Sequence, residues 1–294
     1  MSRIALDVHA HLAPPIPAQA SDVHIGLQQL FQPEALLGWM DEQRIDSAWV
    51  SLPPPLYRPQ LALDHSREWW LYANDGLARL VRPKLRPLFH LPVEHPALAV
   101  EIAERYAGEG AGFSLPAGGA NVTCFSDARL APLWALLDER RSFVFVHPGA
   151  CCDGRLAPYY LENLLGNPYE TAVAIAHLVF GGVRHRHRAI RFCFAHGGGA
   201  APMLAGRWQR GYETRRPGVD AAAPAPRELL GTLLVDSVVH DADAMALAAR
   251  VFGARSILFG SDWPFPMGLP SPHEQLAGVA AELRRAIFSA AALS

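Results

Sequence analysis

Near its start the chain reads Ile4-Ala5-Leu6-Asp7-Val8-His9-Ala10-His11, an apolar run that ends in two histidines separated by one residue. Successive side chains of a β-strand point to opposite faces, so His9 and His11 are expected to point the same way and to bind one cation together. Taken alone, the pattern also fits two surface histidines at a strand end. The stretch therefore predicts an opening strand that carries a candidate metal clamp at its carboxyl end.

Three later stretches repeat this pattern. In each, a short β-branched or aromatic run ends in one histidine or aspartate, followed directly or after one residue by glycine or proline. They are residues 143–149 with His147, residues 190–199 with His196, and residues 256–264 with Asp262. Each is expected to be a strand that presents one polar side chain at its carboxyl end.

Helical patterns alternate with these strands along the whole chain. The predicted strands are 4–11, 47–52, 85–93, 112–115, 143–147, 190–195, 233–236 and 256–260. The predicted helices are 33–44, 66–81, 96–106, 127–140, 168–180, 200–212, 241–252 and 272–291. Eight strand–helix pairs in 294 residues predict an α/β fold of the (β/α)8 TIM-barrel type, in one domain over residues 1–294, with a lid-like insertion at 150–167 after the fifth strand. The alternative, an open doubly wound sheet, would carry a glycine-rich turn where the two histidines stand.

Composition narrows the possible partners and compartments. The net charge of -2, without a basic run, argues against nucleic acid and anionic membranes as partners. No run of 18 apolar residues and no secretory leader pattern is present, so neither a membrane span nor secretion is expected. The four cysteines lack zinc-ribbon spacing and are expected to be reduced thiols in the cytoplasm.

In a barrel the carboxyl ends of all strands meet on one face, which would make distant residues neighbours. These residues are His9, His11, His147, His196 and Asp262. Three imidazoles and a carboxylate suit Zn²⁺ or a similar divalent ion and leave a position open for water or substrate. A second metal bridged by a carbamylated lysine is not expected, because the only lysine, Lys84, precedes the third strand on the opposite face. The sequence therefore predicts one divalent ion, with zinc preferred and manganese as the alternative.

These motifs resemble the amidohydrolase superfamily, and residues 144–266 resemble its decarboxylase branch of the aminocarboxymuconate semialdehyde decarboxylase type. The motifs that carry the resemblance are His147-Pro148, Asp153-Gly154-Arg155, Gly166-Asn167-Pro168-Tyr169-Glu170-Thr171, Cys193-Phe194-Ala195-His196-Gly197-Gly198-Gly199, Asp236-Ser237-Val238-Val239-His240-Asp241 and Gly260-Ser261-Asp262-Trp263-Pro264-Phe265-Pro266. They follow one another in the family's order over roughly the last half of the chain. The first half matches mainly at His9 and His11.

The resemblance implies a role for each matching residue. His9, His11, His147 and Asp262 would hold the metal. His196 would act as the acid and base beside Asp262, which also belongs to the catalytic group.

The resemblance also assigns substrate-binding residues. Arg207 would bind a substrate carboxylate in the site of a neighbouring subunit, which implies a homodimer, and Phe265 would line the pocket. The family carries another arginine after the first histidines, whereas residues 11–33 contain none here. Arg58, in the loop after the second strand, is the candidate to replace it.

The function implied is a metal-dependent, non-oxidative decarboxylase of a small unsaturated or aromatic carboxylic acid. In this interpretation His196 handles the proton, and the cation stabilises the charge left when CO2 departs. The same donor set would also serve a hydrolase of an amide or lactone, or a hydratase, because a divalent ion lowers the pKa of bound water to about 7. A binding protein that has lost catalysis is the third possibility.

Overall fold

Parallel strands that alternate with helices make up the computed structural model, which describes residues 2–118 and 124–293. The strands are β1 (Asp7–His11), β2 (Ala48–Ser51), β3 (Leu85–His90), β4 (Gly112–Ala117), β5 (Phe143–Pro148), β6 (Arg191–Phe194) and β7 (Leu234–Val235). The helices are α1 (Pro33–Gln43), α2 (Leu63–Leu80), α3 (Pro96–Arg105), α4 (Ala131–Glu139), α5 (Asn167–Phe180), α6 (Val183–Arg186), α7 (Ala201–Glu213), α8 (Pro226–Leu230), α9 (Ala242–Phe252), α10 (Pro272–Gln275) and α11 (Ala281–Phe288).

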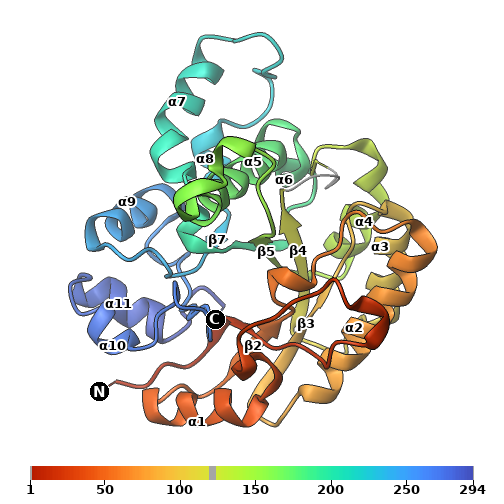
Figure 1. Cartoon of the computed structure of the whole chain (residues 1–294). Coiled ribbons are helices and arrows are strands. Elements are labelled where there is room, and N and C mark those ends of the chain that lie inside the picture. Colours follow the sequence, from red (N-terminus) through yellow and green to blue (C-terminus); the bar gives the residue numbers. More distant parts are fainter. Residues whose placement is uncertain (1, 119–123, 294) are drawn as a thin grey trace.

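The seven strands pair in parallel in the order in which they follow one another in the chain, from β1 to β7. This sequential order rules out a doubly wound sheet, in which the strand order reverses near the middle. The sheet curls into a half-barrel with the helices on its outside (Figure 1). The carboxyl ends of the strands therefore meet on one face of the protein, as predicted.

The strand predicted at 256–260 does not form as a regular strand, and that prediction was wrong in detail. The segment lies between β7 and β1 and makes only isolated parallel bridges, Val235 with Ile257 and Ala10 with Trp263. Its backbone still hydrogen-bonds to both neighbours, because the amide of Leu258 donates to the carbonyl of Val235 at 2.9 Å and the amide of Val8 donates to the carbonyl of Phe259 at 2.9 Å. Side chains hold the end of the segment in addition. The amide of Gly260 donates to Ser237 Oγ at 3.1 Å, and the amide of Ser261 donates to an oxygen of the Asp7 carboxylate at 3.1 Å.

Proline begins many of the helices, as the sequence predicts for 33–44, 96–106 and 168–180. Pro33, Pro96 and Pro168 each stand in the first turn, where the missing N–H group would have no intrahelical partner. The single closing helix predicted at 272–291 is wrong, because α10 and α11 are separate helices. Gly278, a residue type that disfavours helix, lies in the turn between them.

The short helices α6 and α8 were not predicted either. Both are too short to show a periodic apolar pattern. Helix α6 precedes β6 and helix α8 precedes β7 in the chain, and neither helix adds a side chain to the site described below.

Two buried clusters hold the strands and helices together. The larger one fills the layer between the sheet and the helices, with Trp70, Trp134 and Phe252 among its fully buried side chains. The smaller one combines side chains of several strands inside the curled sheet, including Val8, Phe145 and Leu258. The ring of Phe145 lies 4.8 Å from that of His9, so the smaller cluster forms an apolar floor directly beneath the polar residues at the strand ends.

Within residues 2–118 and 124–293, none of the helices combines the length and the apolar character needed to cross a lipid bilayer. All four cysteines are free thiols, as predicted.

Candidate metal centre

His9 and His11 lie side by side at the end of β1 and are both completely buried. Their Nε2 atoms are 3.0 Å apart, which confirms that the two side chains point in the same direction. Two neutral imidazole acceptors at this distance repel each other unless a proton or a cation lies between them. The arrangement therefore favours positive charge at this point.

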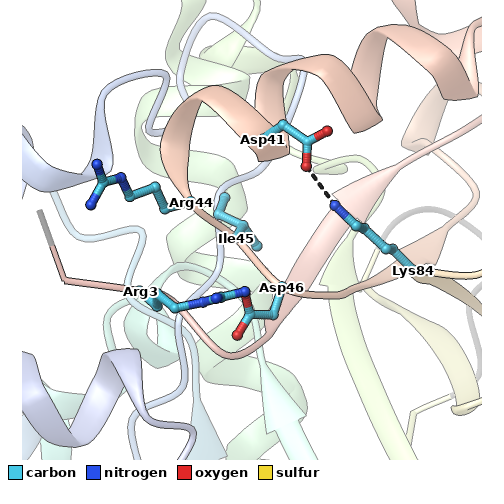
Figure 2. A pocket seen from close by; sticks show the side chains of 6 residues that line it. All are labelled: Arg3, Asp41, Arg44, Ile45, Asp46 and Lys84. Atoms are coloured by element: carbon cyan, nitrogen blue, oxygen red, sulfur yellow. Dashed lines mark hydrogen bonds and ion pairs between the residues drawn. The ribbon is translucent and has the colours of Figure 1, made fainter.

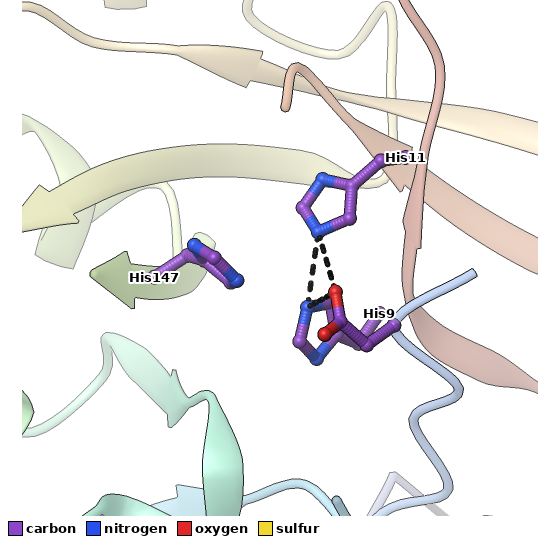
Figure 3. Close-up of side chains that lie close together, drawn as sticks. His9, His11 and His147 are labelled. Carbon is purple, nitrogen blue, oxygen red and sulfur yellow. Dashed lines mark hydrogen bonds and ion pairs between the residues drawn. The ribbon is translucent and has the colours of Figure 1, made fainter. Parts of the chain in front are cut away.

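His147 and Asp262 complete a group of four around this point. Figure 3 shows the three histidines of this group facing one another. One ligand atom from each of His9, His11, His147 and Asp262 lies within 4.8 Å of all the others, and all four residues are buried. Asp262 Oδ1 is 3.2 Å from His9 Nε2 and 3.3 Å from His11 Nε2. This is the set predicted from the sequence, and the tertiary structure brings it together from β1, β5 and the irregular segment before α10.

The polar atoms of this group fit a divalent metal ion. His147 Nε2 and Asp262 Oδ1 are buried and have no hydrogen-bond partner among the described residues. Buried polar atoms are costly without a partner, so both atoms call for a ligand. Three imidazole nitrogens and one carboxylate oxygen form a donor set that suits zinc and similar divalent ions.

Each of the three imidazoles makes a hydrogen bond through its other ring nitrogen. His9 Nδ1 contacts Asp236 Oδ2 at 2.5 Å, His11 Nδ1 contacts Ser51 Oγ at 3.1 Å, and His147 Nδ1 donates to the carbonyl of Pro148 at 2.8 Å. Contacts of this kind fix the tautomer and the orientation of a metal-binding histidine and leave Nε2 free to bind. Asp236 and Ser51 are thus parts of the site that sequence reasoning missed, although both stand at the end of a predicted strand.

The charges in the group favour the metal-binding protonation states of Asp262 and His147 and draw positive charge, as a proton or as a metal ion, to His9. Burial raises the pKa of Asp262, but His9, His11 and His196 outweigh that effect and hold it well below its usual range. Burial, reinforced by the neighbouring histidines, lowers the pKa of His147 well below its usual value. Burial also lowers the pKa of His9, yet Asp262 and Asp236 together raise it to about 10. An ionised carboxylate and a neutral His147 therefore surround a His9 that attracts positive charge.

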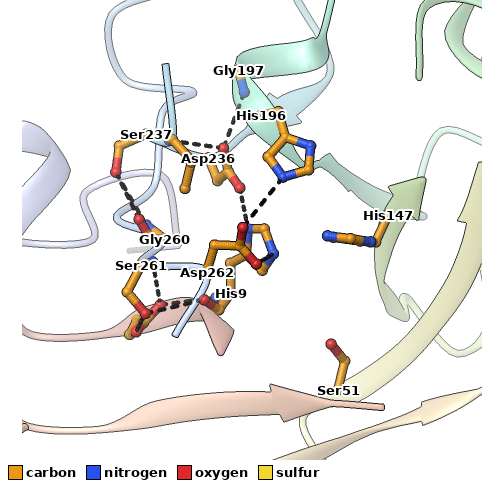
Figure 4. A network of polar contacts seen from close by, with 12 residues as sticks. His9, Ser51, His147, His196, Gly197, Asp236, Ser237, Gly260, Ser261 and Asp262 are labelled. Atoms are coloured by element: carbon orange, nitrogen blue, oxygen red, sulfur yellow. Dashed lines mark hydrogen bonds and ion pairs between the residues drawn. The ribbon is translucent and has the colours of Figure 1, made fainter. Parts of the chain in front are cut away.

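His196 lies beside the four-residue group and remains partly accessible, with 18% of its side chain exposed (Figure 4). Its Nε2 atom is 3.8 Å from Asp262 Oδ2, and its Nδ1 has no hydrogen-bond partner among the described residues. The turn that holds His196 has positive φ angles at His196, Gly197 and Gly198, a conformation that favours glycine. Asp236 fixes this turn as well, because its Oδ1 accepts a hydrogen bond of 3.0 Å from the amide of Gly197.

A cavity of about 320 Å³ opens above these residues. His147, His196 and Asp262 line its floor, and Tyr160, Glu162 and Asn163 of the 150–167 insertion line its wall. Phe265 also lines this cavity, and its ring lies 5.3 Å from that of His11. The structure therefore places a small-molecule cavity directly on the candidate metal site.

The other predicted substrate-binding residues lie outside this cavity. Arg58 lines a neighbouring cavity and forms an ion pair with Asp22 at 2.8 Å. Arg207 is exposed on α7 and is not among the residues that line the cavity at the metal site. A direct role of Arg207 in its own subunit's site is thus not supported by its position.

The only lysine of the chain lies far from these residues, in a charged pocket beyond the amino ends of β2 and β3 (Figure 2). Lys84 forms an ion pair with Asp41 at 2.5 Å in that pocket, which Arg3 and Asp46 also line. It cannot bridge two metal ions at the strand ends. The number of metal ions stays a prediction from the sequence.

Four buried candidate metal ligands at the strand ends of a parallel half-barrel are typical of metal-dependent α/β enzymes. A family model described as Amidohydrolase matches residues 6–293, so the chain belongs to the amidohydrolase family.

Comparisons with known proteins agree with this assignment. The chain is 30% identical over 262 residues to a 2-amino-3-carboxymuconate-6-semialdehyde decarboxylase of Dictyostelium discoideum, an alignment that covers 85% of this chain and 71% of that protein. The fold is shared with IDCase of Metarhizium anisopliae, with a TM-score of 0.81, 21% identity, and coverage of 99% of this chain and 96% of the other. It is also shared with a dihydroxybenzoic acid decarboxylase of Polaromonas with bound manganese, with a TM-score of 0.75, 19% identity, and coverage of 98% and 95%.

Proposed function

We propose that this protein is a metal-dependent, non-oxidative decarboxylase of a small unsaturated or aromatic carboxylic acid. The observation that carries the proposal is the buried group of His9, His11, His147 and Asp262 on the floor of a cavity that fits a small molecule. The relative from Dictyostelium, a decarboxylase by name, supports this reaction over other reactions of the same family.

His9, His11, His147 and Asp262 would hold one divalent ion, for which zinc is proposed and manganese is the alternative. When bound, such an ion supplies positive charge that stabilises negative charge developing on the substrate. The Polaromonas decarboxylase with bound manganese supports a divalent ion in this fold.

The protein's own groups account for the proton that the reaction requires. Decarboxylation breaks the bond between the carboxylate carbon and its neighbour, leaves the electron pair on that neighbour, and adds one proton there. His196 is placed for this step, because its Nε2 faces Asp262 at 3.8 Å and its side chain lines the cavity. An imidazole at this position can take up a proton from water and donate it to that carbon.

The 150–167 insertion is proposed to act as a lid. It supplies Tyr160, Glu162 and Asn163 to the cavity wall, yet Tyr159 is 86% exposed and Leu165 is 54% exposed. A segment that contacts the cavity on one side and exposes apolar side chains on the other is suited to cover a bound substrate.

The exposed apolar side chains also support a homodimer. Tyr169 on α5 is 55% exposed and Met203 on α7 is 77% exposed, and large exposed apolar groups that gather on one face often mark an interface. Arg207 is one helical turn from Met203. We propose that a partner subunit receives Arg207 at its own cavity, where the guanidinium binds a substrate carboxylate by two parallel hydrogen bonds. Phe265 would pack against the same substrate.

The proposal covers residues 1–294 as one catalytic domain and places the enzyme in the cytoplasm, as its reduced cysteines suggest. The test is the product of purified enzyme incubated with a panel of hydroxybenzoates, amino-carboxymuconate and lactones. We expect a loss of 44 mass units and release of CO2 from an acid. Addition of water without gas would support the hydrolase or hydratase alternative instead.

A further inference from the structure

A second cavity of about 170 Å³ adjoins the cavity at the metal site. The two cavities share the lining residues Pro54, Pro55, Gly149 and Ala150. Gly149 lies at the boundary with no room for a side chain, since an added Cβ would come within 2.7 Å of the Tyr57 ring. Because the two cavities share these four lining residues, one elongated molecule can extend from the metal site into the second cavity.

The second cavity is lined by buried polar atoms that have no partner among the described residues. They are Tyr57 Oη and Arg58 Nε, while the indole of Trp70 and the carboxyl group of Glu94 also line the cavity and interact with each other. Trp70 is the most enclosed of these residues, with only 1% of its surface exposed. Two unpartnered polar atoms at one small cavity call for a ligand, because each one costs free energy when it is left without a partner.

Both unpartnered atoms are hydrogen-bond donors, and so is the indole of Trp70. Burial raises the pKa of Tyr57, so its hydroxyl keeps its proton, and the indole of Trp70 can only donate. The guanidinium of Arg58 donates through Nη2 to both oxygens of Asp22, at 2.9 and 2.8 Å, and its Nε has no partner among the described residues. The cavity therefore offers donors to an oxygen atom of a ligand.

The second cavity presents no unbalanced positive charge to a ligand. Asp22 neutralises Arg58, and burial lowers the pKa of His90 to about 3, so that this imidazole is neutral between the rings of Tyr57 and Trp70. Glu94 remains as the residue that can accept a hydrogen bond from a ligand in this cavity. Burial raises the pKa of this carboxyl group, and an anionic ligand beside it would be repelled or would force it to take up a proton.

We propose that the second cavity is a subsite for an uncharged oxygen-containing group, a hydroxyl or carboxamide, at the end of the substrate remote from the reacting carboxylate. Its oxygen accepts a hydrogen bond from Tyr57, and its own O–H or N–H donates to the Glu94 carboxyl group, which Trp70 holds in place. The substrate class is then a carboxylic acid with an uncharged polar group at its far end. This inference rests on the proposed function, in that the carboxylate lies at the metal site.

Equilibrium binding tests this subsite without any need for turnover. The probes are 3- and 4-substituted benzoates that carry a carboxamide, an isopropyl group of similar shape, or a second carboxylate, each titrated calorimetrically into zinc-loaded protein. We expect the carboxamide to bind about tenfold or more tighter than the isopropyl compound, as two or more hydrogen bonds would provide. The second carboxylate should bind more weakly than the carboxamide.

Two variants of the cavity identify the groups responsible. Tyr57→Phe and Glu94→Gln should each reduce the preference for the carboxamide about three- to tenfold, the usual effect of one lost hydrogen bond, and leave isopropylbenzoate binding unchanged. Tyr106→Phe is the matched control, because the hydroxyl of this buried tyrosine donates to Asp75 at 2.7 Å outside both cavities. That variant should keep the full preference.

The outcomes separate the subsite from the proposed reaction. Equal binding of the carboxamide and isopropyl compounds, or no binding of any probe, would show a cavity that holds only water and would overturn the subsite. Tightest binding of the dicarboxylate would overturn the assignment to an uncharged group. If the carboxamide preference and its loss in both variants are found but no acid releases CO2, the subsite stands and the proposed decarboxylation fails.

Discussion

Replacement of Asp236 by asparagine is the sharpest test of how the metal site is held together. The carboxylate is completely buried and makes three contacts at once. Its Oδ2 accepts a hydrogen bond from His9 Nδ1 at 2.5 Å, while Oδ1 accepts from the amides of Gly197 at 3.0 Å and Val238 at 3.1 Å. Asp236→Asn keeps the shape of the side chain and replaces one acceptor oxygen by an NH2 donor.

The expected effect on the metal follows from these contacts. The oxygen of the amide can keep the two backbone donors, and its NH2 group then faces His9 Nδ1. His9 must accept at Nδ1 and carry its proton on Nε2, the atom that should bind the metal. Loss of such a carboxylate partner typically weakens metal affinity by about 10- to 100-fold, or roughly 1.4 to 2.7 kcal/mol.

Competition with a chromogenic chelator measures this change directly, with zinc and with manganese, and thermal unfolding of the metal-free protein measures the stability of the fold. Asp241→Asn is the matched control. Asp241 lies five residues further along the chain and caps α9 by accepting from the amide of Ala244 at 2.8 Å. This variant should lower thermal stability slightly and leave metal affinity unchanged.

An Asp236→Asn protein that folds and binds metal as tightly as the wild type would refute the reasoning, because the His9 tautomer would then not depend on Asp236. Equal loss of affinity in both variants would point to a general loss of stability instead.

The remaining predictions concern catalysis, metal removal and assembly. His196→Ala should retain the metal and lose about 10²- to 10⁴-fold in kcat, the usual contribution of an acid or base, and loss of metal from this variant would make His196 a ligand. Chelation should abolish activity and lower the Tm, because a metal present at 100 times its Kd stabilises the folded state by about 2.7 kcal/mol; an unchanged Tm and full activity after chelation would contradict a metal site. Mixing inactive Arg207→Ala and His196→Ala chains should restore part of the activity in hybrid dimers, and no recovery despite subunit exchange would argue against a shared site.

The sequence by itself determined the features that depend on local geometry. His9 and His11 had to point the same way, because the period of a strand is two, and their Nε2 atoms do lie 3.0 Å apart. His147 and Asp262 could be added because each follows a short apolar run, and parallel strands bring such carboxyl ends together. The proline at the start of α1, α3 and α5 marked these helices for an equally local reason, the absence of an N–H group.

The tertiary structure alone decided which distant groups meet. His9 and Asp236 are 227 residues apart, and no local pattern could show that this carboxylate, rather than another strand-end acid, would contact Nδ1. The eighth strand was predicted as regular because its apolar run resembles the others. Its backbone instead bridges to β7 and β1 only at isolated points, and the side chains of Ser237 and Asp7 accept from the amides of Gly260 and Ser261, which depends on neighbours across the sheet.

The second cavity also depends on which distant residues meet in the folded chain. Tyr57, Trp70 and Glu94 come from a loop, a helix and the end of a strand region, and none of them belongs to a motif. A sequence pattern reports which residue types lie on one face of one element. Whether buried polar atoms from separate elements find partners or are left facing a cavity depends on how those elements pack, and only the folded chain determines that.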